Sequence, residues 1–202
     1  MRNSGEADEP WLRHVRAEIE PGGRIQNWSG SVWRCHSRRY APGSEGGSLR
    51  ASGRFHRATD KFASSECWPA LYTGCSSTIA LGEVVRNTVP TNPSRLGDYA
   101  LSELHVDFSR VFVAHDVDRD SVDSLLGLDF ARECGRSDYR ITQQFARIAR
   151  EYGEAILVPS CTRLPEGSLV IFPDRLDPGS TIRVMDGVNL ALVKQPRNSP
   201  SP

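Results

Sequence analysis

The segment SELHVDF, residues 102–108, constrains the fold of this 202-residue chain more than any other part of its sequence. Three apolar residues alternate in it with three polar ones: Leu104, Val106 and Phe108 with Glu103, His105 and Asp107. Successive side chains of a β-strand point to opposite faces of the sheet, so the alternation predicts a strand with one buried and one solvated face. The chain therefore contains a sheet that is covered on one side.

Two other segments carry the 3.6-residue period of amphipathic helices. In SDYRITQQFARIAREYG, residues 137–153, large apolar residues recur at helical spacing, and Gly153 can end the helix: Ile141, Phe145, Ile148 and Tyr152. In SSTIALGEVVRN, residues 76–87, Ser76 or Ser77 can cap the first turn of a second helix. We therefore predict one helix in each segment.

Short apolar or alternating runs between Pro, Gly and Asp residues predict the remaining strands: SVWRCH, PALYTG, AILV, SLVIF and TIRVM. The chain has no internal repeat and few helices, which favours an α+β fold over a regular βαβ winding. Its length suits a compact single domain of small mixed sheets with a few flanking helices. We expect this domain over residues 28–193, between a loosely ordered N-terminal extension, 1–27, and a flexible C-terminal tail, 194–202.

The charge balance excludes some classes of partner. Lys and Arg number 25, as do Asp and Glu, so the formal net charge is zero. The chain therefore has no global field to hold a polyanion, which argues against direct binding of nucleic acid. No apolar run approaches the roughly 20 residues that cross a bilayer, and the N-terminus MRNSGEADEPW is too acidic and polar for a signal peptide. We expect a cytoplasmic protein without a membrane partner.

The five cysteines and five histidines predict neither disulfides nor a metal site. The cysteines are odd in number and widely scattered, and they form no CxxC motif: Cys35, Cys67, Cys75, Cys134 and Cys161. The histidines show no HExxH or comparable ligand spacing. We therefore expect free thiols and no catalytic metal.

Glu83 is unusual for its place on the predicted helix. On a helical wheel it falls between Ile79 and Ala80, at the edge of the buried face. Taking a carboxylate partly out of water is costly unless donors or cations meet it. Glu83 is therefore a solvated border residue, a structural ion pair with an arginine, or a functional carboxylate, and its position alone leaves all three open.

Three further residues have both an ordinary and a functional interpretation. Arg54 follows Gly53 at a predicted turn, where a guanidinium suits an anionic oxygen pair such as a phosphate, although Gly-Arg turns are common. Ser160 follows an apolar strand, where ligand-binding residues gather, or it simply belongs to a turn. No GxSxG elbow surrounds it, so we do not predict a nucleophile. Arg34, on a strand, is ordinary when taken alone.

Together these segments resemble the RES-domain family, named for its Arg, Glu and Ser. The segments VWRCHSRRY, SGRFH, ALYTG, TIALGEVV and AILVPS follow the family pattern in order and at similar intervals, over about residues 32–173. The resemblance implies a site made of Arg34, Arg54, Tyr72, Glu83 and Ser160. The chain departs from the pattern at His56, where Asn is frequent, and in the segment 57–68, which is longer than in compact members.

The resemblance implies a fold like that of ADP-ribosyltransferases and NAD as the substrate. Arg34 and Arg54 would hold the NAD pyrophosphate, Tyr72 would stack on the nicotinamide, and Ser160 would orient the substrate. Glu83 would stabilise the oxocarbenium-like state formed when the nicotinamide–ribose bond breaks. Glu83, Arg54 and Tyr72 are then the expected catalytic residues, with no cofactor beyond NAD itself.

The resemblance also implies a biological role and leaves rival activities open. RES-domain proteins are mostly toxins of bacterial toxin–antitoxin pairs, so a cognate antitoxin of the Xre helix-turn-helix type is the expected partner. Hydrolysis or phosphorolysis of NAD is the predicted reaction, the latter with inorganic phosphate as co-substrate. Transfer of ADP-ribose to a macromolecule is an alternative, because it differs only in what attacks the ribose. A non-catalytic partner-binding module is a second alternative.

Overall fold

The strand predicted at residues 102–108 lies at the centre of the fold. The structure is a computed structural model that describes residues 13, 16, 17, 24–45, 47–88, 93–114, 139–160, 162 and 164–189. Its strands are β1 (Ile25–Ser37), β2 (Leu71–Gly74), β3 (Tyr99–Val113), β4 (Ala155–Val158), β5 (Ser168–Ile171) and β6 (Thr181–Asn189). Its helices are α2 (Ser77–Thr88) and α5 (Arg140–Tyr152), with the short 3-10 turns η1 (Ser64–Glu66), η2 (Pro93–Asp98) and η3 (Pro173–Arg175). Most of the two predicted loose ends lies outside these residues.

Each predicted strand and helix is present, and the central strand extends beyond the alternating segment, residues 102–108, from which it was predicted. β3 extends over 15 residues, and Leu104, Val106 and Phe108 are buried along it as the alternation predicted. α5 ends at Tyr152, directly before Gly153, as expected. α2 is capped by Ser76, whose Oγ accepts a hydrogen bond from the Ile79 amide at 3.4 Å.

The strands form one mixed sheet in which β3 has three partners. β1 pairs antiparallel with β3 along almost its full length, and β6 and β4 pair with successive parts of β3. The remaining pairings run from β4 to β5 and from β5 to β2, and β2 meets β1 at Trp33 and Gly74. The pairings therefore form a closed cycle of strands that runs from β1 through β2, β5, β4 and β3 back to β1. Only β3 and β4 run parallel among the described strands, and this mixed sheet with two helices confirms the α+β prediction.

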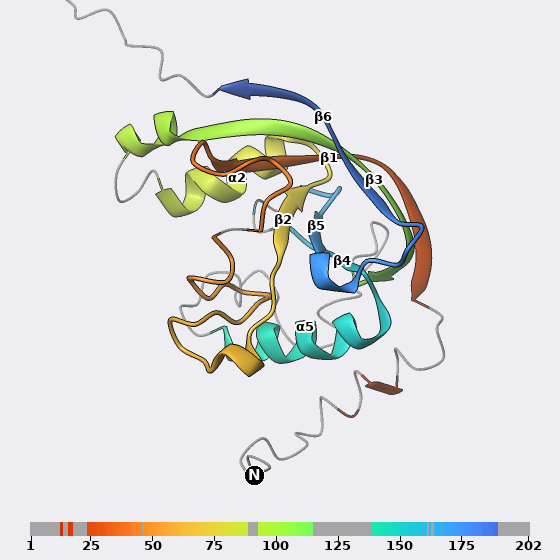
Figure 1. The fold of residues 1–202 in the computed structure, drawn as a ribbon. Helices are drawn as coiled ribbons and strands as arrows, with labels where there is room; N and C mark the ends of the chain where they lie inside the picture. The colour runs from red at the N-terminus through yellow and green to blue at the C-terminus, as the bar shows by residue number, and fades with distance from the viewer. Residues whose placement is uncertain are drawn as a thin grey trace, which may run out of the picture.

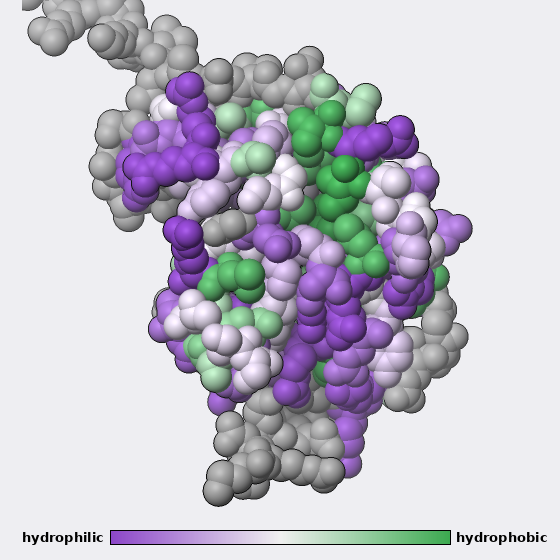
Figure 2. Space-filling model, in the orientation of Figure 1, coloured by the Kyte–Doolittle hydropathy of each residue, from purple (hydrophilic) through white to green (hydrophobic). Residues whose placement is uncertain are grey.

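The two helices lie at opposite ends of the short strands (Figure 1). The long strands β1, β3 and β6 arch over one side of the molecule, with α2 beneath their upper part and α5 across the far end of β2. This arrangement leaves β6 as an edge strand, paired only with β3 in the described part of the chain. Val184 and Met185 are exposed on it, and Figure 2 shows a band of hydrophobic residues in the region where β6 crosses β3.

The short strands β4 and β5 are buried on both faces, which explains their unbroken apolar sequences. Ala155, Leu157, Leu169 and Ile171 belong to one core cluster, together with Leu104, Val106 and Phe108 of β3. The residues between them belong to a second cluster, in which α5 packs on the sheet: Ile156, Val158 and Val170 with Phe112, Phe145 and Ile148. The alternation of each short strand thus divides its side chains between two cores.

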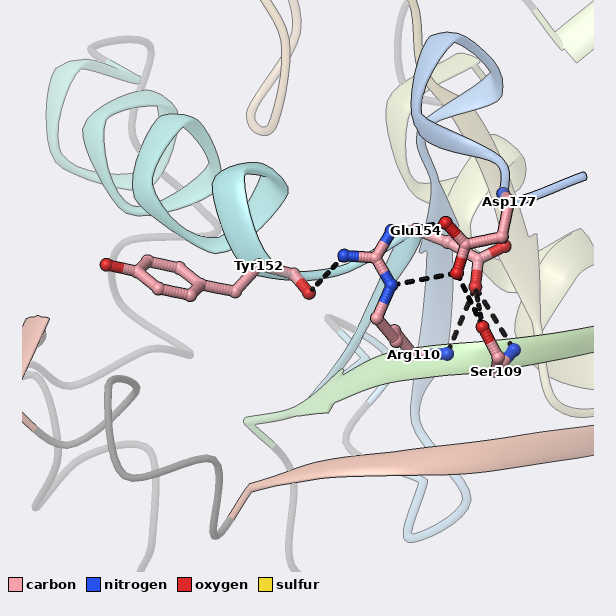
Figure 3. Close-up of polar contacts among 5 residues, drawn as sticks. All are labelled: Ser109, Arg110, Tyr152, Glu154 and Asp177. Atoms are coloured by element: carbon pink, nitrogen blue, oxygen red, sulfur yellow. Dashed lines mark hydrogen bonds and ion pairs between the residues drawn. The ribbon is translucent and has the colours of Figure 1, made fainter.

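Glu154, between α5 and β4, is a fully buried carboxylate at the junction of three segments (Figure 3). Its Oε1 accepts hydrogen bonds from the amides of Ser109 and Arg110 at 3.1 and 3.0 Å, and its Oε2 accepts one from the Asp177 amide at 3.1 Å. The Ser109 hydroxyl lies within hydrogen-bond distance of Glu154 Oε1, 2.9 Å, and Asp177 Oδ2, 2.6 Å. Backbone donors thus satisfy the carboxylate and hold β3 and the segment after β5 to the start of β4.

The outer part of this network is an ion pair. Arg110 donates from Nε to Asp177 Oδ2 at 2.8 Å and from Nη2 to Oδ1 at 2.6 Å, and its Nη1 donates to the Tyr152 carbonyl at 3.2 Å. Bidentate arginine–carboxylate pairs are the strongest surface pairs because both hydrogen bonds hold the same geometry. The pair therefore fixes the segment after β5 against the end of α5.

We expect Glu154→Gln to lower the free energy of unfolding by about 3 kcal/mol, because the amide turns an NH2 group toward buried N–H donors and leaves at least one of them without an acceptor. Urea unfolding measures the loss. Glu151→Gln is the matched control, since Glu151 is 41% exposed in its pair with Arg16 and should change stability by about 0.5 kcal/mol or less. Equal effects of the two substitutions would contradict the role given to Glu154.

The Arg110 guanidinium, followed by the Ser109 hydroxyl, lowers the pKa of Asp177 from 3.8 to about 2. Because the pKa of Asp177 is lower in the folded protein, the ionised carboxylate stabilises the fold at pH values above 3.8. This stabilisation is lost as the pH falls from 3.8 toward about 2. We expect Asp177→Asn to flatten the acid dependence of stability between pH 3.8 and about 2. Thermal unfolding across this range tests it, and an unchanged slope in the variant would contradict it.

Candidate active site

An ion pair between a turn and a helix forms the centre of the candidate site. Arg54 lies in a tight turn closed by the Gly53 amide, which donates to the His56 carbonyl at 3.3 Å. Its Nη2 donates to Glu83 Oε2, on α2, at 2.5 Å. The two side chains are only 13% and 19% exposed, so the pair is largely shielded from water. Of the alternatives left open for Glu83, the structure shows an ion pair with an arginine, and that arginine is Arg54.

Close packing between β2 and α2 sets the position of Glu83. A Cβ atom at Gly74, the last residue of β2, would lie 2.6 Å from the Ala80 amide nitrogen and 2.8 Å from Ile79 Cγ2. A side chain at position 74 would therefore displace the first turn of α2. Ile79 and Ala80 are buried against the sheet, and Glu83, one turn on, faces the edge of this contact, as the helical wheel predicted.

Ser160 reaches the same carboxylate from the other side. The Ser160 hydroxyl donates to Glu83 Oε1 at 3.1 Å and lies 2.7 Å from Thr162 Oγ1. Its oxygen also accepts a hydrogen bond from the Thr162 amide at 3.1 Å. Ser160 is 5% exposed, so this hydroxyl is held in place by three contacts. Arg54 and Ser160 thus occupy one oxygen each of Glu83.

A cavity of about 260 Å³ opens beside these residues. Its lining combines the ion pair with aromatic and apolar side chains: Arg54, Glu83, Phe55, Tyr72, Tyr139, Thr73, Ala80, Val84, Val158, Pro159, Ser168, Val170, Cys35 and Gly53. A mostly apolar cavity with a few convergent polar groups is the usual form of a small-molecule site. Strand β2, helix α2, the turn at Arg54 and the end of β4 all contribute to it.

Tyr72 lines this cavity, while its hydroxyl faces the turn that carries Arg54. The Tyr72 oxygen accepts a hydrogen bond from the Phe55 amide at 2.8 Å and lies 2.9 Å from His56 Nδ1. The His56 ring lies edge-on to the Tyr72 ring, with centroids 5.5 Å apart. Burial raises the pKa of Tyr72 well above its ordinary value, so the phenol keeps its proton.

Arg34 is the predicted site residue that the structure does not bring into the cluster. It lies on β1 next to Cys35, which does line the cavity, and successive residues of a strand point to opposite faces. Its Nη1 donates to the Pro42 carbonyl at 2.5 Å. Burial lowers the pKa of Arg34 to about 10, so it remains charged at neutral pH. Its contact is with the segment after β1.

The described residues offer neither a metal centre nor an activated thiol. No group of three or more His, Cys, Asp or Glu side chains in them lies close enough to hold a metal ion. Burial raises the pKa of Cys35, at the cavity wall, to about 11, so its thiol is protonated at neutral pH. A reactive cysteine needs the opposite shift.

Sequence reasoning did not assign several residues that support or line the site, among them Gln143, Thr162, Tyr139 and His56. Gln143 of α5, 4% exposed, donates from Nε2 to the carbonyls of Gly53 and His56 at 2.9 and 3.1 Å. Thr162 supports Ser160, and Tyr139 lines the cavity. His56 was noted only as a departure from a pattern. Gln143 and its neighbour Gln144 are buried in the structure, but on a helical wheel Gln143 falls opposite the apolar stripe, so no sequence pattern pointed to it.

The comparisons with known proteins agree with this architecture. The profile of the RES domain matches residues 31–192, so the chain belongs to the RES-domain family. Among the solved structures that match is the crystal structure of the Mycobacterium tuberculosis MbcT–MbcA toxin–antitoxin complex. The alignment has a TM-score of 0.67 and 20% sequence identity over 91% of this chain and 93% of that chain. No curated protein sequence matches significantly.

The family and the fold confirm two of the predictions. Membership of the RES-domain family confirms the resemblance drawn from the segments between residues 32 and 173. The structural match confirms the α+β fold, which this chain shares with the aligned M. tuberculosis chain. In addition, no helix in the described part of the chain is long and apolar enough to cross a membrane.

Proposed function

We propose that this protein degrades NAD by cleaving the bond between nicotinamide and ribose. The observation that carries the proposal is the Glu83 carboxylate, held by Arg54 at 2.5 Å and by Ser160 at 3.1 Å in the wall of a mostly apolar cavity. A carboxylate with fixed geometry at such a wall can stabilise a positive charge that develops in a bound substrate. The five residues Arg34, Arg54, Tyr72, Glu83 and Ser160 keep the types expected of the family.

Breaking this bond leaves its electron pair on the nicotinamide nitrogen and creates an oxocarbenium-like ribose. Glu83 stabilises that ribose and orients the group that attacks it. When water attacks, the products are nicotinamide, ADP-ribose and a proton. When inorganic phosphate attacks, the ribose takes the phosphate instead. Ser160 orients Glu83 and the ribose hydroxyls by hydrogen bonding and forms no covalent bond with the substrate.

The remaining site residues bind the substrate. Arg54 shares its guanidinium between Glu83 and the pyrophosphate, because a guanidinium presents five N–H donors in a planar fork that matches phosphate oxygens. The Tyr72 ring, in the cavity lining, stacks on the nicotinamide. A cavity of about 260 Å³ is small for a whole dinucleotide, so the nicotinamide and its ribose enter it. The remainder of NAD lies toward the mouth, and Arg34, which is bonded to the Pro42 carbonyl and does not line the cavity, is given no contact with it.

The biological role that we propose is that of a toxin with a cognate antitoxin. The aligned M. tuberculosis chain belongs to a toxin–antitoxin complex, and an enzyme that consumes NAD harms its own cell unless it is inhibited. The antitoxin, a small helix-turn-helix protein of the Xre type, covers the cavity and carries the DNA binding. The protein itself acts in the cytoplasm and binds neither nucleic acid nor membrane.

The reaction can be tested by incubating purified protein with NAD, with and without phosphate, and separating the products. Free nicotinamide with ADP-ribose indicates hydrolysis, and a phosphorylated ADP-ribose formed only with phosphate indicates phosphorolysis. A modified macromolecule in a cell extract would favour transfer of ADP-ribose. Unreacted NAD at high enzyme concentration would favour a non-catalytic binding module and contradict the proposal.

Glu83→Gln isolates the chemistry. The amide can still accept a hydrogen bond from Arg54 and donate one to Ser160, so the contacts survive while the charge is lost. We expect turnover to fall at least about a hundredfold with little change in NAD binding and thermal stability. Glu66→Gln is the matched control, because Glu66 pairs with Arg57 at 3.9 Å, outside the cavity, and is 43% exposed. Full turnover by Glu83→Gln would contradict the mechanism.

Expression of the wild-type chain alone should stop bacterial growth and lower cellular NAD, because the expected antitoxin is absent. Growth rate and NAD content after induction measure the effect, and the Glu83→Gln variant at equal soluble level is the control. Cells that grow normally with normal NAD while they hold soluble wild-type protein would contradict the toxin role. The family and the fold would be unaffected by that result.

A further inference from the structure

The turn that carries Arg54 is held by an unusually complete set of side-chain hydrogen bonds. Three of its carbonyls each accept a hydrogen bond from a side chain. Gln143 Nε2 donates to those of Gly53, at 2.9 Å, and His56, at 3.1 Å. Trp68 Nε1 donates to that of Phe55 at 3.0 Å. The donors come from α5 and from the end of the segment 57–68, far from the turn in sequence.

The hydrogen-bond directions around His56 follow from its two ring contacts. His56 Nε2 lies 2.8 Å from the Ala51 carbonyl, which can only accept, so Nε2 carries a proton. Burial lowers the pKa of His56, so the ring is neutral and Nδ1 has a free lone pair. The Tyr72 hydroxyl therefore donates to Nδ1, and its oxygen accepts the Phe55 amide proton. Tyr72 thus joins two parts of the turn.

The space at Gly53 fits the same arrangement. A Cβ atom there would lie 2.5 Å from His56 Cε1, 2.8 Å from His56 Nδ1 and 2.8 Å from the Tyr72 hydroxyl oxygen. These distances are too short for any side chain, so only glycine permits the contact between His56 and Tyr72. Together the side chains of His56, Tyr72 and Gln143 form what we call the turn frame.

We propose that the turn frame consists of positioning residues, which fix the turn so that the Arg54 guanidinium meets Glu83 and the substrate, and that the essential link is the hydrogen bond from the Tyr72 hydroxyl to His56 Nδ1. This inference rests on the proposed function for its kinetic consequences. It assigns the Tyr72 hydroxyl to the turn, while the Tyr72 ring remains available to the substrate. It gives His56 and Gln143 roles without contact with NAD.

Two substitutions at His56 separate the essential link from general packing. An asparagine amide oxygen occupies nearly the place of Nδ1, so His56→Asn keeps an acceptor for Tyr72 and loses the contact with Ala51. A glutamine amide reaches the place of Nε2, so His56→Gln keeps the contact with Ala51 and loses the acceptor. We expect His56→Asn to keep kcat/KM for NAD within about threefold of wild type. His56→Gln and Tyr72→Phe should lose about 10- to 100-fold, the usual effect of a displacement of about 1 Å at a catalytic group.

A double-mutant cycle distinguishes positioning from a structural role. If the turn frame acts through Arg54, Tyr72→Phe should have no further effect on kcat/KM once Arg54 is replaced by Ala. Thr59→Val is the matched control, because it removes the hydrogen bond from Thr59 to the Leu49 carbonyl near the turn and should leave kcat/KM unchanged. Additive losses in the cycle, or full activity of folded His56→Gln, would overturn the proposal.

A measurement without NAD keeps this inference separate from the proposed function. Nitrogen NMR of the histidine rings should show His56 as the neutral form protonated at Nε2, with an Nδ1 resonance that shifts in Tyr72→Phe. A proton on Nδ1 would overturn the turn frame whether or not NAD is cleaved. If wild-type protein does not cleave NAD but His56 has the expected form and responds to Tyr72→Phe, the proposed function fails and the turn frame stands.

Discussion

The buried carboxylate of Glu154 is the interaction on which the placement of the other elements depends. A carboxylate without contact with water is tolerated only when donors surround it, and the amides of Ser109, Arg110 and Asp177 supply them. These donors belong to β3 and to the segment after β5, so the start of β4 has one position relative to both. β4 then leads, through Val158, to Ser160 at the candidate site. The geometry at Glu83 is thereby linked to a contact at the other end of β4.

Glu83 and Glu154 show how the same group takes different roles. Glu154 is fully buried and receives mostly backbone donors, which cannot turn toward a ligand. Glu83 is partly exposed at a cavity wall, and its donors are the side chains of Arg54 and Ser160. Side-chain donors can be shared with a substrate, whereas backbone donors in a sheet cannot. This difference favours a structural role for Glu154 and a functional one for Glu83.

The site combines parts that differ in how firmly they are held. α2 brings Glu83 on a helix packed on β2, and β4 brings Ser160 from the middle of the core. Arg54 comes from a turn outside regular secondary structure, where the backbone has the most freedom. The hydrogen bond that Tyr72 accepts from the Phe55 amide and the one that Gln143 donates to the Gly53 carbonyl restrict that freedom. A guanidinium on a turn can then be placed almost as well as one on a helix.

The sequence by itself determined the secondary structure, the α+β class and the family, because these follow from local alternation, helical spacing and the order of short motifs. It predicted Glu83 at the edge of a buried face, and it predicted Arg54, Tyr72 and Ser160 as site residues through the resemblance to the family. Only the tertiary structure decided that Arg54 is the partner of Glu83, 29 positions away in the sequence. Likewise, only the structure showed that Arg34 contacts the Pro42 carbonyl. It also showed that Gln143, 90 positions from Gly53, binds the turn that carries Arg54. Such contacts join distant segments, and a periodic pattern says which face of an element is buried but not which residue of another element lies against it.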